Sequence, residues 1–300
     1  ADGAEVHDAG GRWAMPGLWD AHVHMAQWES LISRLDVSGT DGPDEVLARI
    51  RAHLDGPDAP VVGEVLQGFG FRLGQWSRLP STAELDAVVV SVDYRMAPEH
   101  RAPTASYDAI DVVRWLHDHA DHGVDRDRIG LCGDSAGGNL SAIVAQQLRD
   151  LRTSAGEPVI RHQALIYPAT DLTMASPSIR EHADGAILTE DKIIAFRTLY
   201  IGDAQDAVAY ADPIVSPLFG DVTGVAPALV QTADLDPIRD DGLRYAEALR
   251  AVGVEVRVTN YLGLPHGFAS FPGVARAGAQ SRHELVTEIR RHLVGGDGRA

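Results

Sequence analysis

Cysteine is nearly absent from this sequence of 300 residues, because Cys132 is the only one. A single cysteine can form no disulfide within the chain and cannot build a zinc site from thiolates. We expect Cys132 to be a small, buried strand residue. Basic residues are also scarce: 26 lysines and arginines stand against 43 aspartates and glutamates, a formal net charge of −17. Such a chain has no basic face for a phosphate backbone, so nucleic acid is not an expected partner.

Long hydrophobic runs are missing as well. No apolar run approaches the roughly 18 residues of a membrane span, and the sequence does not open as a secretory signal does. We therefore expect no membrane association and a soluble, cytoplasmic protein. Apolar residues still make up 45% of the chain, which is enough to bury a core. Chemistry has to come from serine, histidine or carboxylate side chains.

From about Val88 onward, short apolar runs alternate with amphipathic stretches. This pattern is typical of an α/β protein with a mostly parallel sheet and helices on both faces. A helical stretch at 178–200 has no strand beside it, which predicts a cap over the sheet. The predicted strands are 87–92, 128–132, 164–167, 228–232 and 255–261, and the predicted helices are 107–119, 140–151, 242–252 and 277–293.

A possible nucleophile lies in the sequence GDSAG, residues 133–137, between a predicted strand and a predicted helix. A sharp turn from strand to helix presents the Ser135 hydroxyl at the edge of the sheet. We expect glycine at 133 and 137 because a Cβ atom at either position would collide with neighbouring backbone. The free N–H groups at the start of the helix would let the amide of Ala136 donate to an oxyanion.

A nucleophilic serine needs a base, and the base needs a carboxylate to orient it. Asp236 follows the predicted strand 228–232, and His266 follows the predicted strand 255–261. Residues just beyond parallel strands meet at one rim of the sheet, so both side chains could converge on Ser135. Asp234 and Asp240 are competitors for the acid; Asp240 also suits a helix N-cap or a salt bridge.

Four ordered motifs resemble the bacterial hormone-sensitive-lipase-type esterases, an α/β-hydrolase family. They are VDYRMAPEHRAP at 92–103, GDSAGGN at 133–139, DPIRD at 236–240 and HGF at 266–268. The resemblance implies that Ser135, His266 and Asp236 form a catalytic triad, with Ala136 as an oxyanion donor. It also implies hydrolysis of short- to medium-chain acyl esters through an acyl-enzyme, no metal or organic cofactor, a small-molecule ester as the partner, and a homodimer.

The first 86 residues depart from this family because they lack the HGGG stretch that completes its oxyanion hole. Instead, GRWAMPGLWDAHVHM at 11–25 resembles the first barrel strand of metal-dependent amidohydrolases, in which the pair equivalent to His22 and His24 binds metal. Two histidines alone lack the further ligands that a catalytic metal site needs. We therefore expect a fusion: an amidohydrolase-like fragment at 1–86 that replaces the N-terminal strands and part of the cap, and an α/β-hydrolase core at 87–300 with a cap segment at about 176–210.

A replacement for HGGG is predicted at Gln67–Phe71 (QGFGF), after a predicted strand at 61–66. Gly68 and Gly70 could supply the missing oxyanion donors, because glycine lets backbone approach a tetrahedral centre closely; equally, this loop could be an ordinary surface turn. Asp134, Phe69 and Trp76 are candidates for binding substrate. Two other functions stay open: an impaired hydrolase that binds esters without an oxyanion hole, and a metal-dependent amidohydrolase.

Overall fold

A computed structural model of the chain describes residues 35–36, 68–69, 90, 92–119, 125–202, 208–270 and 276–295. Within these residues lies a parallel sheet of four strands in the order β3-β4-β5-β6. A second, two-stranded parallel sheet pairs β1 with β2. The strands are β1 (Leu35–Asp36), β2 (Gly68–Phe69), β3 (Ile129–Asp134), β4 (Ile160–Ile166), β5 (Ala228–Leu235) and β6 (Val256–Pro265).

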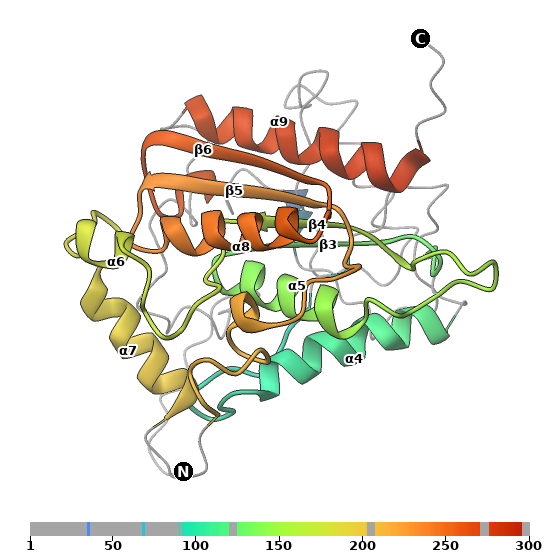
Figure 1. Ribbon diagram of the computed structural model, residues 1–300, viewed down its shortest axis with the longest axis horizontal. Helices are drawn as coiled ribbons and strands as arrows, with labels where there is room; N and C mark the ends of the chain where they lie inside the picture. Colours follow the sequence, from blue (N-terminus) through green and yellow to red (C-terminus); the bar gives the residue numbers. More distant parts are fainter. Residues whose placement is uncertain are drawn as a thin grey trace.

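Helices cover both faces of the four-stranded sheet (Figure 1). One face carries α4 (Thr104–Asp118), α5 (Ala136–Gln147) and α8 (Arg239–Ala251), and the other carries α9 (Arg276–Arg290). A single π-helical turn, Arg291–Gly295, extends α9. Two further helices, α6 (Ser178–Glu181) and α7 (Glu190–Ile201), lie together at one end of the sheet, and short 3₁₀ turns occur at Pro217–Phe219 and Phe268–Ser270.

Apolar packing on both faces explains why the strands read as continuous apolar runs. On one face, Ile143 of α5 and Ile110 of α4 pack with Leu131 of β3 in the same buried cluster. On the other face, Ile166 of β4 and Tyr261 of β6 form a buried cluster against which Leu285 of α9 packs. Burial of this kind contributes roughly 25 cal/mol per Å² of apolar surface.

The predicted strands at 128–132, 164–167, 228–232 and 255–261 and the predicted helices are all present, with boundaries shifted by a few residues. The strand predicted at 87–92 is not confirmed where the structure describes it, since Val90 and Val92 lie outside strands. The cap at 178–200 forms two helices, α6 and α7, instead of one continuous helix. Among the described residues, none of the helices combines the length and the apolar character needed to cross a bilayer.

Cys132 is exposed, so the prediction of a buried cysteine is wrong. Its strand, β3, is at the edge of the four-stranded sheet in the described part of the chain. Burial along β3 alternates, with Ile129 and Leu131 buried and Gly130, Cys132 and Asp134 exposed. The apolar residues of β3 therefore face α4 and α5, and on the opposite face the Leu293 side chain lies against Gly130 while Cys132 stays exposed.

Candidate active site

Ser135 occupies a sharp turn between β3 and α5. The strand ends at Asp134, the helix begins at Ala136, and Ser135 between them has φ 53° and ψ −113°. A positive φ is uncommon for a residue that carries a Cβ, and such strain persists only where the surroundings enforce it. Here the Ser135 N–H donates to the carbonyl of Ile166 at the end of β4, at 2.9 Å. The turn thus fixes the serine at the carboxyl end of the parallel strands.

The close approach of backbone around this turn requires glycine at one of the two predicted positions. A Cβ added to Gly133 would lie 2.2 Å from the carbonyl carbon of Gly137, which is far inside van der Waals contact. A Cβ added to Gly137 itself would meet no atom within 4 Å in the described part of the chain. The prediction that a Cβ atom would collide with backbone is therefore confirmed for Gly133 and is wrong for Gly137. Gly138, which the prediction omitted, is also confined, because its Cβ would lie 2.9 Å from the Pro168 side chain.

Ser135, His266 and Asp236 are joined in one chain of hydrogen bonds. The distance from His266 Nε2 to Ser135 Oγ is 3.0 Å, and His266 Nδ1 donates to Asp236 Oδ2 at 2.7 Å. Asp236 is completely buried, and its other oxygen accepts from the N–H of Ile238 at 3.0 Å. Asp236 follows β5 and His266 follows β6, so the three side chains meet at the carboxyl ends of β3, β5 and β6. This is the arrangement of a nucleophile, a base and an orienting carboxylate.

The two competing carboxylates have other partners. Asp234 accepts from the side-chain amide of Asn260 at 3.4 Å and from the N–H of Gly263 at 3.2 Å. Asp240 forms an ion pair with Arg239 at 2.9 Å, as the salt-bridge interpretation predicts. The N-cap of α8 is Ile238, so the interpretation of Asp240 as an N-cap is wrong.

Tyr167 packs against the imidazole of His266, a contact that the sequence analysis did not predict. The two ring centroids are 4.8 Å apart, with the planes inclined at 58°. Tyr167 is buried, and its hydroxyl donates to Asp134 Oδ2 at 3.5 Å. Asp134, a predicted substrate-binding residue, is thus exposed beside the candidate nucleophile. Tyr167 is the last residue of a predicted strand, so the sequence could have placed it at the rim of the sheet, near the triad.

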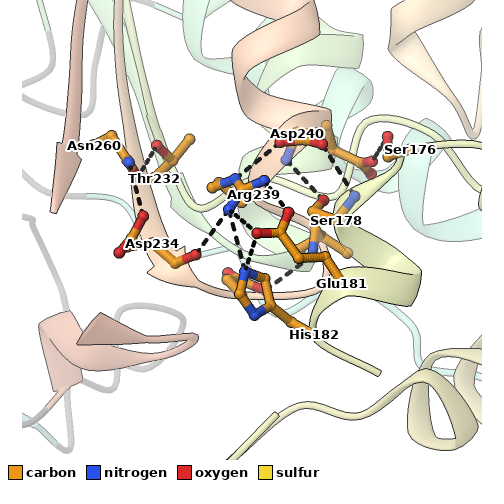
Figure 2. Close-up of polar contacts among 12 residues, drawn as sticks. Ser176, Ser178, Glu181, His182, Thr232, Asp234, Arg239, Asp240 and Asn260 are labelled. Carbon is orange, nitrogen blue, oxygen red and sulfur yellow. Dashed lines mark hydrogen bonds and ion pairs between the residues drawn. The ribbon is translucent and has the colours of Figure 1, made fainter. Parts of the chain in front are cut away.

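Arg239 links the cap to the loop that carries Asp236 (Figure 2). Its guanidinium pairs with Glu181 of α6 at 2.6 Å and with Asp240 at 2.9 Å. The hydrogen bond from Arg239 lowers the pKa of Glu181, and the two carboxylates raise the pKa of Arg239. The Ser178 N–H also donates to Asp240 Oδ2 at 3.0 Å. The ion pairs and this hydrogen bond hold α6 against the start of α8.

A hollow of about 390 Å³ lies between the cap and the ends of β5 and β6. Residues 180–186 of the cap form one wall, and Leu235 and Pro265 form another. These two residues immediately precede Asp236 and His266. The hollow is therefore adjacent to the hydrogen-bonded chain and is walled by the cap.

The remaining predicted site residues lie in the N-terminal part of the chain. Gly68 and Phe69 form β2 and pair with Leu35–Asp36, so the prediction of a loop is wrong for these two residues. The other N-terminal predictions lie outside the described residues: Gly70, Trp76, His22, His24 and the strand at 61–66.

The fold and this site define a class of protein. A family model for the α/β-hydrolase fold matches residues 78–270 of this chain, and the chain belongs to that family. The match begins slightly before the domain boundary predicted at residue 87 and includes Ser135, Asp236 and His266.

Two relatives and one solved structure place the chain among esterases of this family. It is 38% identical over 289 residues to the carboxylic ester hydrolase LipN of Mycobacterium tuberculosis, an alignment that covers 93% of this chain and 73% of LipN. It is also 38% identical over 247 residues to the esterase LipI of the same organism, covering 80% of this chain and 75% of LipI. A hyperthermophilic esterase from the archaeon Pyrobaculum calidifontis superposes with a TM-score of 0.63 at 38% identity, covering 72% of this chain and 74% of that chain. These matches confirm the resemblance to hormone-sensitive-lipase-type esterases.

Proposed function

We propose that this protein hydrolyses carboxylic esters with short- to medium-chain acyl groups, through an acyl-enzyme formed on Ser135. The observation that carries the proposal is the chain of hydrogen bonds from Ser135 through His266 to the buried Asp236. The protein is a carboxylic ester hydrolase by its relationship to named esterases at 38% identity over most of the chain. The roles of single residues and the acyl preference are our inference.

The geometry supports a two-stage reaction. Ser135 Oγ attacks the ester carbonyl while His266 Nε2, 3.0 Å away, takes the hydroxyl proton. Asp236 holds Nδ1 protonated and stabilises the imidazolium that forms. His266 then gives the proton to the leaving alcohol, which breaks the ester bond and leaves the acyl group on Ser135. In the second stage His266 activates a water molecule, which releases the acid and restores the serine.

The substrate is expected to occupy the hollow between the cap and the triad. Its walls are residues 180–186 of the cap, with Leu235 and Pro265 opposite. A volume of about 390 Å³ is at the low end of small-molecule pockets, which suits short- to medium-chain esters. Asp134, Phe69 and Trp76 are proposed to contact substrate.

The leading experiment separates serine chemistry from metal chemistry. Initial rates are measured on p-nitrophenyl esters from acetate to laurate, with and without prior treatment with a chelator. We expect hydrolysis that is fastest for the shorter acyl chains and unchanged by chelation, because no step uses a metal ion. A metal-dependent amidohydrolase that uses His22 and His24 predicts the reverse. Activity that is lost on chelation and retained in Ser135→Ala would overturn the proposal.

The oxyanion hole is proposed to combine the N–H of Ala136 with backbone donors at Gly68 and Gly70. Ala136 is the first residue of α5, where the N–H groups have no partner within the helix. The N-terminal segment is the remaining source of donors, because the HGGG sequence is absent. Among the described residues, β3 is at the edge of the sheet with one side open, so a neighbouring segment is needed there.

Substituting valine for Gly68 or Gly70 is expected to lower kcat by about two to three orders of magnitude, the usual effect of losing an oxyanion donor. Gly63→Val, which places the same bulk in the predicted strand five residues before Gly68, is the matched control and is expected to change kcat by less than about tenfold. Melting curves establish that each variant is folded. If Gly68→Val and Gly70→Val both fold and keep the full rate, the donors lie elsewhere.

We further propose that residues 1–86 are an amidohydrolase-like fragment that completes the hydrolase, with residues 87–300 as the core and about 176–210 as the cap segment. The LipN alignment covers 93% of the chain, so most of residues 1–86 align with an esterase, which supports a part for them in ester hydrolysis; the amidohydrolase likeness rests on the sequence GRWAMPGLWDAHVHM at 11–25. A homodimer is proposed on the family resemblance alone.

A further inference from the structure

A second cluster of polar side chains lies away from the triad, between the sheet and the C-terminal helix. It consists of His162 on β4, Glu288 on α9 and His292 in the π-helical turn that follows α9. One ring nitrogen of each histidine and a carboxylate oxygen of Glu288 lie within 4.8 Å of one another. Neither the ester hydrolase reaction nor the packing of the core explains why these three groups meet.

His162 is the unusual member of the cluster. Only 1% of its surface is exposed, and neither of its ring nitrogens has a hydrogen-bond partner within the described part of the chain. Burying polar groups without partners is costly, and native structures rarely leave both nitrogens of a histidine unsatisfied. Burial also lowers the pKa of His162 to about 4. The ring lies against His292, with centroids 4.7 Å apart.

Glu288 brings a buried carboxylate to the two imidazoles. Its side chain is 4% exposed, and its Oε2 lies 3.6 Å from His292 Nε2. Glu288 and His292 are four residues apart, which places them on one side of the helical segment. Arg257 pairs with Oε1 at 3.1 Å, whereas the contact from Arg291 to Oε2 is long, at 3.4 Å. Arg291 pairs more closely with Glu255, at 2.6 Å, so Oε2 of Glu288 is available to bind a metal ion.

We propose that His162, Glu288 and His292 bind a divalent transition-metal ion, with zinc as the best match. Two histidines and one glutamate form an established zinc donor set, and a water molecule can complete the tetrahedron. Bonds of 2.0–2.1 Å put the ligand atoms of such a site about 3.4 Å apart, so the cluster has to contract. His292 can move toward His162 because its side chain is partly exposed, at 15%, and a hollow of about 360 Å³ opens beside it.

The position of the cluster indicates a structural site. His162 is four residues before Ile166, whose carbonyl holds the Ser135 turn. At about 3.3 Å per residue, this separation is about 13 Å along the strand, so the cluster and the triad are near opposite ends of the sheet. An ion here contacts β4 and the segment after α9 together. It would fasten the C-terminal helix to the sheet and leave ester hydrolysis to Ser135.

Zinc binding is tested on the full chain after treatment with a chelator and removal of the chelator. Calorimetry is expected to show one Zn²⁺ per chain, and Co²⁺ to give the absorption bands of a tetrahedral site. At a free zinc concentration of about 100 times Kd, Tm is expected to rise by about 5 °C. His292→Ala removes one ligand and is expected to raise Kd by about 100-fold and to abolish the rise in Tm.

Two other histidines serve as controls. His283→Ala alters an exposed histidine on the same helix and is expected to keep the wild-type Kd. His266→Ala is expected to do the same, which separates this cluster from the triad. His162 is buried, so a loss of zinc binding in His162→Gln could also come from misfolding. The decisive variant is therefore His292→Ala, because His292 is more exposed. The absence of Zn²⁺ and Co²⁺ binding overturns the proposal, as does an unchanged Kd in His292→Ala or a loss of binding in His266→Ala.

Discussion

Ser135→Ala is expected to lower kcat for p-nitrophenyl acetate by about a millionfold, the effect of removing the nucleophile of a serine hydrolase. The variant lacks the Oγ atom that lies 3.0 Å from His266 Nε2. Without this oxygen no proton can pass to His266 and no acyl-enzyme can form. Alanine keeps a Cβ and therefore adds no new strain at φ 53°. Residual rates are measured at high enzyme concentration, and the fold is checked by circular dichroism.

Ser154→Ala is the matched control for this variant. Ser154 is exposed in a turn before β4, and its loss is expected to leave kcat within about twofold. A fluorophosphonate that labels activated serines gives a second measurement, because it should add one group to the wild type and none to Ser135→Ala. Retention of more than about one hundredth of the wild-type rate by a pure sample of Ser135→Ala would contradict the assignment.

Asp236→Asn is expected to lower kcat by about 10⁴-fold while the protein stays folded. The carboxylate now fixes the proton on His266 Nδ1 through a 2.7 Å bond, which leaves Nε2 free to accept from Ser135. An amide NH₂ in that place donates to Nδ1 and favours the other tautomer, with the proton on Nε2. Asparagine keeps an oxygen for the N–H of Ile238, so the buried loop retains that bond.

Asp234→Asn tests the competing carboxylate in the same assay. Asp234 accepts from Asn260 and from the N–H of Gly263 at the surface of the site, so its substitution is expected to change kcat by less than about tenfold. If Asp234→Asn loses the larger factor and Asp236→Asn keeps its activity, the assignment of the acid is wrong.

Much of the site could be predicted from the sequence because its residues follow strands directly. Ser135, Asp236 and His266 each come just after an apolar run, and parallel strands bring such positions to one rim. Local patterns could not choose between Asp234 and Asp236, since they are two residues apart and both lie near the end of β5. The partners that distinguish the two carboxylates lie in and just after β6, which begins about 20 residues further along the chain.

Contacts between distant segments were beyond sequence reasoning. Arg239 pairs with Glu181, which is 58 residues earlier, and nothing in the pattern around either residue indicates the other. The exposure of Cys132 has the same origin. A small residue in a strand was expected to be buried, whereas its burial depends on where that strand lies in the sheet, and β3 lies at the edge in the described part of the chain. The two residues of β2 were too few to produce a strand pattern of their own.

The ion pair of Arg239 with Glu181 has a consequence for engineering. One way to change the acyl preference of a capped hydrolase is to exchange its cap segment for that of a relative, which treats the cap as an independent module. Here α6 contacts the first turn of α8 directly, through Glu181 with Arg239 and Ser178 with Asp240. A transplanted cap that lacks the carboxylate of Glu181 removes an ion pair of Arg239, and one that lacks the hydroxyl of Ser178 removes the hydrogen bonds of that hydroxyl to the Pro237 carbonyl and the Asp240 N–H. Cap and acid loop should therefore be exchanged as one unit.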